Sequence, residues 1–124
     1  MLVVLGFYKR KPGTTHEEFS NYWREVHGPL IRNHPDAMRY MKRYVQHHLD
    51  TSDMGVTTPL EFDGFFEVWY ESREDRGAPR ASRGFLEDIV PDEELFLDLS
   101  KTRTAMFDSQ VVQIGETFVP APTA

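Results

Sequence analysis

The chain contains no cysteine among its 124 residues. Disulfide bonds, thiolate nucleophiles and sulfur-ligated metal sites are therefore all excluded. The sequence also lacks a glycine-rich phosphate loop, a serine nucleophile elbow and a strong metal-ligand spacing. Any catalysis must then come from histidine, carboxylate or tyrosine side chains or from a bound cofactor. We expect neither a cofactor nor a metal ion.

A positive charge excess and long hydrophobic runs are also missing. The chain has 14 Lys and Arg against 20 Asp and Glu, a formal net charge of −6. This balance argues against a nucleic-acid partner, which needs basic side chains to neutralise phosphates. No apolar run reaches the roughly 20 residues that span a bilayer, so we expect no membrane association. We expect a cytoplasmic protein.

Bulky apolar residues are plentiful, since 40% of the chain is hydrophobic and 13% aromatic. This composition and length suit one domain with one core.

A β-branched and aromatic run predicts a strand over residues 2–9. A helix should begin after Thr15, where Glu18 completes a capping box. Its apolar face recurs at three- and four-residue steps. That face consists of Phe19, Tyr22, Trp23, Val26, Leu30 and Ile31.

The rest of the chain contains further predicted strands and helices. Strands are predicted over 40–49 and 61–70, joined by a polar loop. Helical spacing over 85–99, interrupted by Pro91, predicts two short helices or one kinked helix. A last strand is expected within 102–115.

The resulting order, βαββαβ, predicts an α+β ferredoxin-like fold. In this fold a four-stranded antiparallel sheet carries two helices on one face. We expect this domain over residues 1–115, followed by a C-terminal tail over 116–124.

The second face of the predicted sheet is too apolar to face water. By strand alternation it should carry Tyr44, Phe65, Trp69, Met106 and Val112. We therefore expect a homodimer in which two sheets close into one α/β barrel around an internal cavity.

Three stretches resemble the EthD-like family of the dimeric α+β barrel superfamily. They are FYKRKPGTTHEEFSNYWREVHGPL, the strand pair RYVQHHL and FDGFFEVWY, and PDEELFLDLSKTRTAMFDSQVV. The resemblance implies a dimer that needs no cofactor. It also implies kinship with polyketide-pathway decarboxylases and dehydratases and with muconolactone isomerases, without fixing a reaction.

His27 is the first candidate for catalysis. It lies about 40° beyond Trp23 on the helix, at the edge of the apolar stripe. The Gly28-Pro29 pair that follows is expected to end or bend the helix. One interpretation is a structural imidazole stabilised at the helix terminus, and the other is a proton carrier at the cavity mouth. The family resemblance favours the proton carrier.

His47 and His48 are neighbours on one strand and must point to opposite faces. Alternation predicts His48 in the cavity and His47 under the helices, although a one-residue slip would exchange them. His48 is therefore the second catalytic candidate. The alternative is a histidine hydrogen-bonded in the dimer interface.

Three carboxylates are further candidates. Asp63 and Glu67 share a strand face but lie about 13 Å apart, which is too far for a close acid pair. Asp63 could orient a histidine or act as a general acid, or it could be a turn residue. Glu67 and Asp108 are predicted to contact substrate. Their alternatives are an interface ion pair and an exposed edge carboxylate.

Tyr44, Phe65 and Trp69 could stack on a flat ring, or they could simply pack. We predict a cofactor-independent lyase, either a decarboxylase or a dehydratase, acting on an aromatic or polyketide-derived ring. His27 or His48 would move a proton while Tyr44 or the second histidine stabilises the developing enolate. The alternatives are a non-catalytic ligand-binding or accessory protein of an oxygenase pathway, and an isomerase or cofactor-free oxygenase of the same superfamily.

Overall fold

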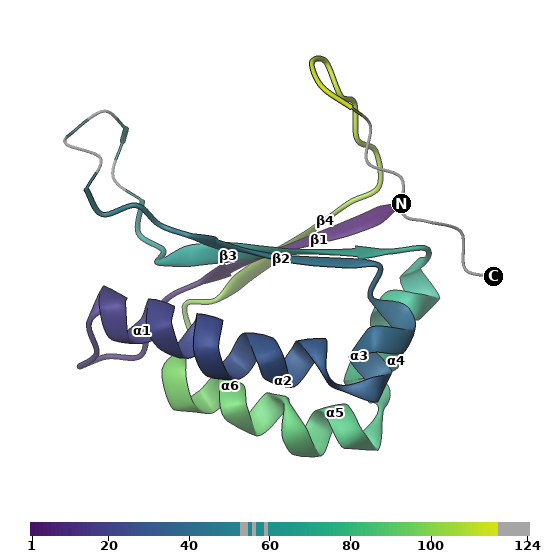
Figure 1. Cartoon of the computed structure of the whole chain (residues 1–124), viewed down its shortest axis with the longest axis horizontal. Coiled ribbons are helices and arrows are strands. Elements are labelled where there is room, and N and C mark those ends of the chain that lie inside the picture. Colours follow the sequence, from purple (N-terminus) through teal and green to yellow (C-terminus); the bar gives the residue numbers. More distant parts are fainter. Residues whose placement is uncertain (53–54, 56, 59, 117–124) are drawn as a thin grey trace.

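The computed structural model describes residues 1–52, 55, 57–58 and 60–116. Its four strands pair antiparallel in the order β2-β3-β1-β4. They are β1 (Leu2–Tyr8), β2 (Arg43–His48), β3 (Gly64–Tyr70) and β4 (Arg103–Phe107). The helices gather on one side of the sheet, and the described residues place none on the other (Figure 1). The predicted ferredoxin-like α+β architecture is confirmed.

The first helical stretch continues through the point where the sequence suggested an end. It comprises α1 (His16–Tyr22), the π-helical turn η1 (Trp23–His27) and α2 (Gly28–Arg32). Gly28 donates its N–H to the carbonyl of Trp23, five residues back. The side chain of Gln46 donates to the same carbonyl at 3.0 Å. Pro29 has no N–H to lose, and the wide turn accommodates it within a continuing helix.

The remaining helices are short and capped by local side chains. They are α3 (Pro35–Tyr40), α4 (Arg73–Ala81), α5 (Arg83–Asp88) and α6 (Val90–Phe96). The predicted capping box of Thr15 and Glu18 is present at α1. Neither α3 nor α4 was predicted, because short helices rich in polar residues carry little apolar periodicity. Ser72 nevertheless caps α4 by accepting a hydrogen bond from the Asp75 N–H.

Trp23 is the centre of the packing between helices and sheet, with no exposed surface. Its ring lies against Tyr8 and Phe19, with centroids 5.4 and 5.5 Å away. Gly64 makes this approach possible. A methyl group there would lie 2.8 Å from the indole and 2.4 Å from the carbonyl oxygen of His47.

The strand register corrects the predicted faces of β2. Tyr44 pairs with Val68, and His48 pairs with Gly64, so both lie on the helix side of the sheet. His47 pairs with Phe65 on the open side. The assignment of His48 and His47 to these two faces was therefore reversed. Both sets of alternate residues in β2 are amphipathic, so the pattern alone did not fix the parity.

The open side of the sheet is an aromatic surface. Phe65 stacks on His47 at 4.3 Å and on Phe7 at 5.3 Å between ring centroids. Phe65 and Trp69 lie on this side as predicted. Met106 does not, because it pairs with Val4 on the helix side. Val112 lies beyond the end of β4.

The predicted C-terminal tail lies outside the described residues, apart from Glu116. Within the described part of the chain, no helix has both the length and the apolar character needed to cross a membrane.

Candidate active site

His27 ends the π-helical turn and is completely buried. Its Nδ1 lies 2.8 Å from Oδ2 of Asp92 on α6. The other carboxylate oxygen of Asp92 accepts a hydrogen bond from the Tyr22 hydroxyl. An ionised carboxylate can only accept, so Nδ1 carries the proton of the neutral ring and the lone pair is on Nε2.

That Nε2 is a buried atom with no hydrogen-bond partner among the residues described. Burial lowers the pKa of His27 below its ordinary value, and the hydrogen bond to Asp92 opposes this effect only in part. The ring is therefore neutral near pH 7. An oriented imidazole with an unused lone pair is suited to taking a proton from a bound molecule.

A small cavity lies between the sheet and the helices, with a volume of about 60 Å³. Its polar lining includes Tyr8, Tyr44, Tyr70, Arg80 and Glu93. Glu93 follows Asp92 in sequence and lies 3.0 Å from the Arg80 guanidinium. Burial and then the charge of Glu93 raise the pKa of Tyr8, which keeps its hydroxyl protonated.

The cavity is too small for a ring compound in this conformation. Water occupies about 30 Å³ in the liquid, so the space suits about two water molecules. His27 is not among the residues that line it. A substrate can reach Nε2 only if the neighbouring side chains move.

Tyr44 lines the cavity, and its hydroxyl is held by a side-chain hydrogen bond. The amide nitrogen of Gln46 donates to its hydroxyl oxygen at 3.1 Å. Because that oxygen already accepts a hydrogen bond, its own proton is available for an acceptor within the cavity. Burial raises the pKa of Tyr44 to about 12, so the hydroxyl stays a donor at neutral pH.

His48 does not line the cavity, and it is linked to Tyr44 through the side chain of Gln46. Its Nε2 lies 2.9 Å from the amide oxygen of Gln46, and its Nδ1 contacts the Ser20 hydroxyl. Burial, with a smaller contribution from Arg24, lowers the pKa of His48 to about 4. The neutral ring therefore fixes the orientation of the Gln46 amide, which in turn positions Tyr44.

Asp63 lies elsewhere, in a separate ion cluster at the start of β3. It accepts hydrogen bonds from the Arg10 N–H at 2.9 Å and the Arg10 guanidinium at 2.8 Å. His16 contacts the same carboxylate at 2.9 Å. Burial alone would raise the pKa of Asp63, but these hydrogen bonds outweigh it and lower the pKa. The contacts of Asp63 are with Arg10 and His16, and none of its hydrogen bonds among the described residues goes to His27 or His48.

The other predicted binding residues also lie away from the cavity. Phe65, Glu67 and Trp69 are on the open side of the sheet, opposite the helices. Asp108 follows β4, and its exposed carboxylate lies 3.8 Å from Arg73. Tyr44 alone among the predicted substrate contacts lines the cavity.

Several residues of the site were missed by the sequence reasoning, namely Tyr8, Tyr22, Gln46, Arg80, Asp92 and Glu93. Asp92 and Glu93 follow Pro91 in the first turn of α6, where acidic residues ordinarily serve the helix terminus. The one available signal in the sequence was helical spacing. Phe96 lies four residues after Asp92, so the two share a helix face, and an apolar residue there indicates that the face is buried.

The described part of the chain contains no group of three His, Asp or Glu side chains that could hold a metal ion. The site is thus built from a histidine, its carboxylate and a set of tyrosines.

Comparison with known proteins places this chain in a family. Residues 11–100 match the EthD domain. The chain belongs to the EthD domain family. The matched region contains His27, Asp92, Tyr44 and the Gln46–His48 pair.

Two curated proteins are distant relatives of this EthD domain. The chain is 27% identical over 113 residues to the decarboxylase claH of Passalora fulva, covering 82% of this chain and 70% of that protein. It is 26% identical over 110 residues to the dehydratase ustZ of Ustilaginoidea virens, covering 82% and 77%.

Solved structures share the fold. An EthD family protein from Bacillus halodurans superposes with a TM-score of 0.65 at 16% identity, covering 89% of this chain and 99% of that one. The cofactor-independent oxygenase SnoaB from Streptomyces nogalater gives 0.58 at 10% identity, covering 90% and 95%. At these identities the likeness concerns the fold alone.

Proposed function

We propose that this EthD domain is a cofactor-independent lyase, a decarboxylase or dehydratase, acting on an aromatic or polyketide-derived ring. The observation that carries the proposal is the buried, unpaired Nε2 of His27, oriented by Asp92. The distant relation to one protein named a decarboxylase and one named a dehydratase supports the reaction class.

In a dehydration, His27 Nε2 takes the proton next to a carbonyl. The electron pair moves into an enolate, whose oxygen accepts a hydrogen bond from Tyr44. Collapse of the enolate expels hydroxide, which leaves as water with the proton from His27. In a decarboxylation, His27 takes a ring hydroxyl proton, carbon dioxide departs, and His27 returns the proton to the ring carbon.

A substrate screen tests this proposal. The protein is incubated with aromatic and polyketide-derived hydroxy acids and hydroxy ketones, and mass spectrometry detects loss of carbon dioxide or water. His27→Gln should abolish turnover, while Arg83→Gln, an exposed change on α5, should not. Equal turnover by wild type and His27→Gln would reject the assignment.

We also propose that two subunits pair through the open side of the sheet, as expected from the sequence. The support is the aromatic surface of Phe7, Phe65 and Trp69, which no described helix covers. A surface of this kind is unusual in a monomer. Light scattering that shows a stable monomer at micromolar concentration would contradict the pairing.

A non-catalytic ligand-binding or accessory protein is the second candidate. It is favoured by one observation, that His27 does not line the closed cavity. In that case ligand binding would persist, and pathway function would be unchanged, in His27→Gln. An isomerase would yield a product of unchanged mass, and a cofactor-free oxygenase would consume dioxygen.

A further inference from the structure

A groove of about 370 Å³ opens next to the small cavity. Residues of α2, α3 and the edge strand β2 form its walls. The groove and the cavity share Ile31, Met41 and Tyr44 as lining residues. Tyr44 therefore borders both spaces, and a molecule in the groove lies beside the residue whose hydroxyl the proposed reaction uses.

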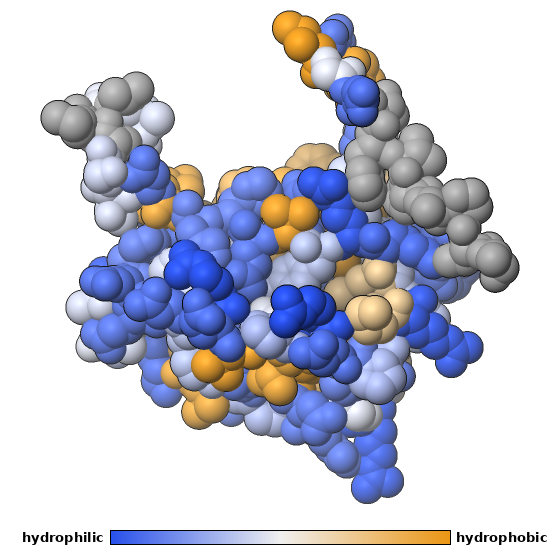
Figure 2. All heavy atoms as spheres, in the orientation of Figure 1, coloured by the Kyte–Doolittle hydropathy of each residue, from blue (hydrophilic) through white to orange (hydrophobic). Residues whose placement is uncertain are grey.

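The charge of this groove is opposite to that of the whole molecule. Its described lining contains Arg24, Arg32, Lys42 and Arg43 and no acidic residue. The whole chain has 20 acidic residues against 14 Lys and Arg. On the face seen in Figure 2, hydrophilic side chains border a small hydrophobic area between the helices and the edge of the sheet. Local positive charge on an acidic protein concentrates anions at this place.

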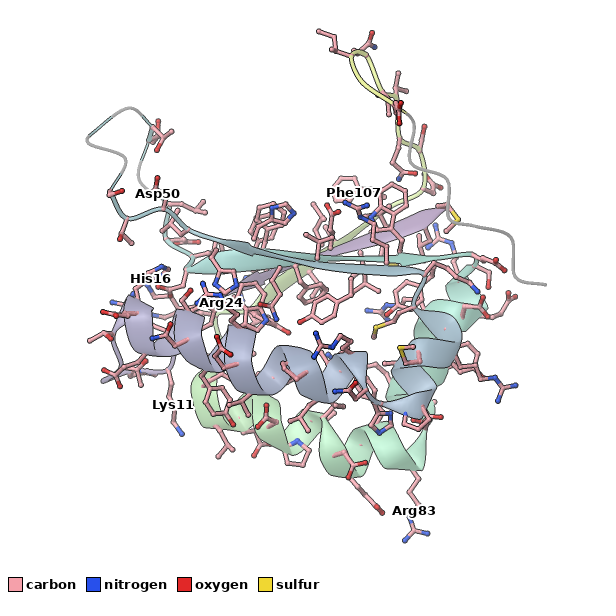
Figure 3. The ribbon with its side chains drawn as sticks, viewed as in Figure 1. Lys11, His16, Arg24, Asp50, Arg83 and Phe107 are labelled. Carbon is pink, nitrogen blue, oxygen red and sulfur yellow. The ribbon has the colours of Figure 1, made fainter. Side chains whose placement is uncertain are left out.

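Two of the four cations are already engaged by carboxylates. Lys42 lies 3.8 Å from Glu71, and Arg43 lies 3.4 Å from Glu67. Arg24 instead donates to the side-chain amide oxygen of Asn21 at 3.3 Å, and it lies on the β2 side of its helix (Figure 3). Neither Arg24 nor Arg32 has a carboxylate within salt-bridge distance among the residues described. These two guanidinium groups are available for an external anion.

The floor of the groove is apolar, with Ile31, Met38 and Met41. Sites for small organic ligands have volumes of about 300–1,000 Å³, and they combine apolar walls with a few polar groups. The groove falls in that range at 370 Å³, whereas the inner cavity of about 60 Å³ does not. The bulk of a ring compound that reaches Tyr44 would therefore lie in the groove.

We propose that the groove binds a ring compound bearing a carboxylate. Arg24 and Arg32 pair with the carboxylate, the ring lies over the apolar floor, and its far edge reaches Tyr44. Guanidinium groups suit this role because their planar fork matches a carboxylate. The assignment of the far edge as the reacting end rests on the dehydratase form of the proposed function, because a decarboxylase must bring the carboxylate itself to the reacting groups; the anion site does not rest on it.

Binding of salicylate tests the proposal, with salicylamide as the uncharged ligand of the same shape. Titration is followed by calorimetry and by backbone amide NMR shifts. Salicylate should bind about a hundredfold more tightly, the gain expected from two charged hydrogen bonds of about tenfold each. The largest shifts should fall on Gly28, Met38 and Lys42. Arg24→Gln and Arg32→Gln should each weaken salicylate binding about tenfold and leave salicylamide unchanged.

Arg83→Gln is the matched control, because Arg83 lies on α5 beside Glu87, away from the groove (Figure 3). It should leave salicylate binding unchanged. Equal affinity for salicylate and salicylamide, or shifts confined to other surfaces, would overturn the proposal. So would salicylate binding that survives both groove substitutions.

The outcome is separable from that of the proposed function. Salicylate binding in the groove without turnover of any acid would leave the anion site standing and reject the lyase. Turnover that depends on His27 but not on Arg24 or Arg32 would support the lyase and reject the anion site.

Discussion

Two of the histidine–carboxylate pairs in the described chain have similar lengths and different surroundings. His27 and Asp92 are 2.8 Å apart in the helix layer, and His16 and Asp63 are 2.9 Å apart at the start of β3. The second ring nitrogen of His16 lies 3.1 Å from the Leu49 carbonyl. The second ring nitrogen of His27 has no partner in the described chain. A histidine–carboxylate pair alone does not indicate proton transfer. The unpartnered second ring nitrogen of His27 is the feature suited to it.

The surroundings of the two carboxylates explain this difference. Asp63 accepts hydrogen bonds from Arg10 as well as His16, and it joins the loop after β1 to the start of α1 and β3. Arg10 also donates to the Thr14 carbonyl, and the second ring nitrogen of His16 contacts the Leu49 carbonyl, so the cluster holds several chain segments together. Among the residues described, the Asp92 carboxylate accepts hydrogen bonds from Tyr22 and His27 alone, so its main effect is to orient one ring.

The largest effect is expected from His27→Gln. The variant should lose about 10²- to 10⁴-fold in turnover, the usual contribution of a general base. His16→Gln should lose none per folded molecule, because the His16 ring already spans two acceptors. The rates of both variants with the substrate found by screening check the contrast. A comparable loss in His16→Gln would show that the two pairs are not functionally distinct.

Asp92→Asn should reduce turnover less and shift its pH dependence. Asp92 raises the pKa of His27 against the stronger effect of burial, so its neutralisation should lower that pKa further. The acidic limb of the kcat/KM profile should consequently move to lower pH. A profile of unchanged shape would mean that His27 is not the titrating base.

Asp63→Ala should affect stability without affecting turnover. Removal of the shared acceptor leaves Arg10 and His16 unpaired, at a cost of about 1–3 kcal/mol in the free energy of unfolding. The pKa of Asp63 is lowered in the folded state. Its contribution is therefore present above the unfolded pKa of about 3.9 and is lost as pH falls through the folded value. Urea unfolding at pH 7 and at acidic pH measures both effects.

The smallest effect concerns His48, whose pKa is lowered to about 4 in the folded protein. The unfolded chain binds the proton near pH 6.5, so stability should fall as pH drops from about 6.5 towards the folded value. His48→Gln should flatten this part of the stability profile. It should also reduce kcat more than it changes KM, because Tyr44 loses its orientation through Gln46. An unaltered pH profile in the variant would show that His48 does not titrate in this window.

Much of the fold was predictable from local patterns. The capping box at Thr15 and the four strand regions follow from side chains close in sequence. The ends of elements were less predictable: β4 stops at Phe107, and helix α3 occupies the stretch before β2. These limits depend on which neighbours a segment packs against.

The site was predictable only where it depends on one motif. The helix pattern and the family resemblance singled out His27, and the structure adds the carboxylate that orients it. Asp92 lies 65 residues away, and local periodicity carries no information about that pairing. Asp63 was expected to orient a histidine, to act as a general acid or to be a turn residue, and the structure pairs it with Arg10 and with His16.

The sequence by itself determined the order of the elements, the start of the first helix and the position of His27 on it. It also determined that His47 and His48 face opposite ways, because side chains alternate along every strand. Only the tertiary structure decided which of them lies under the helices, because β3 sets the register of β2. It also decided which histidine keeps a free nitrogen, because burial and partners come from segments distant in the chain.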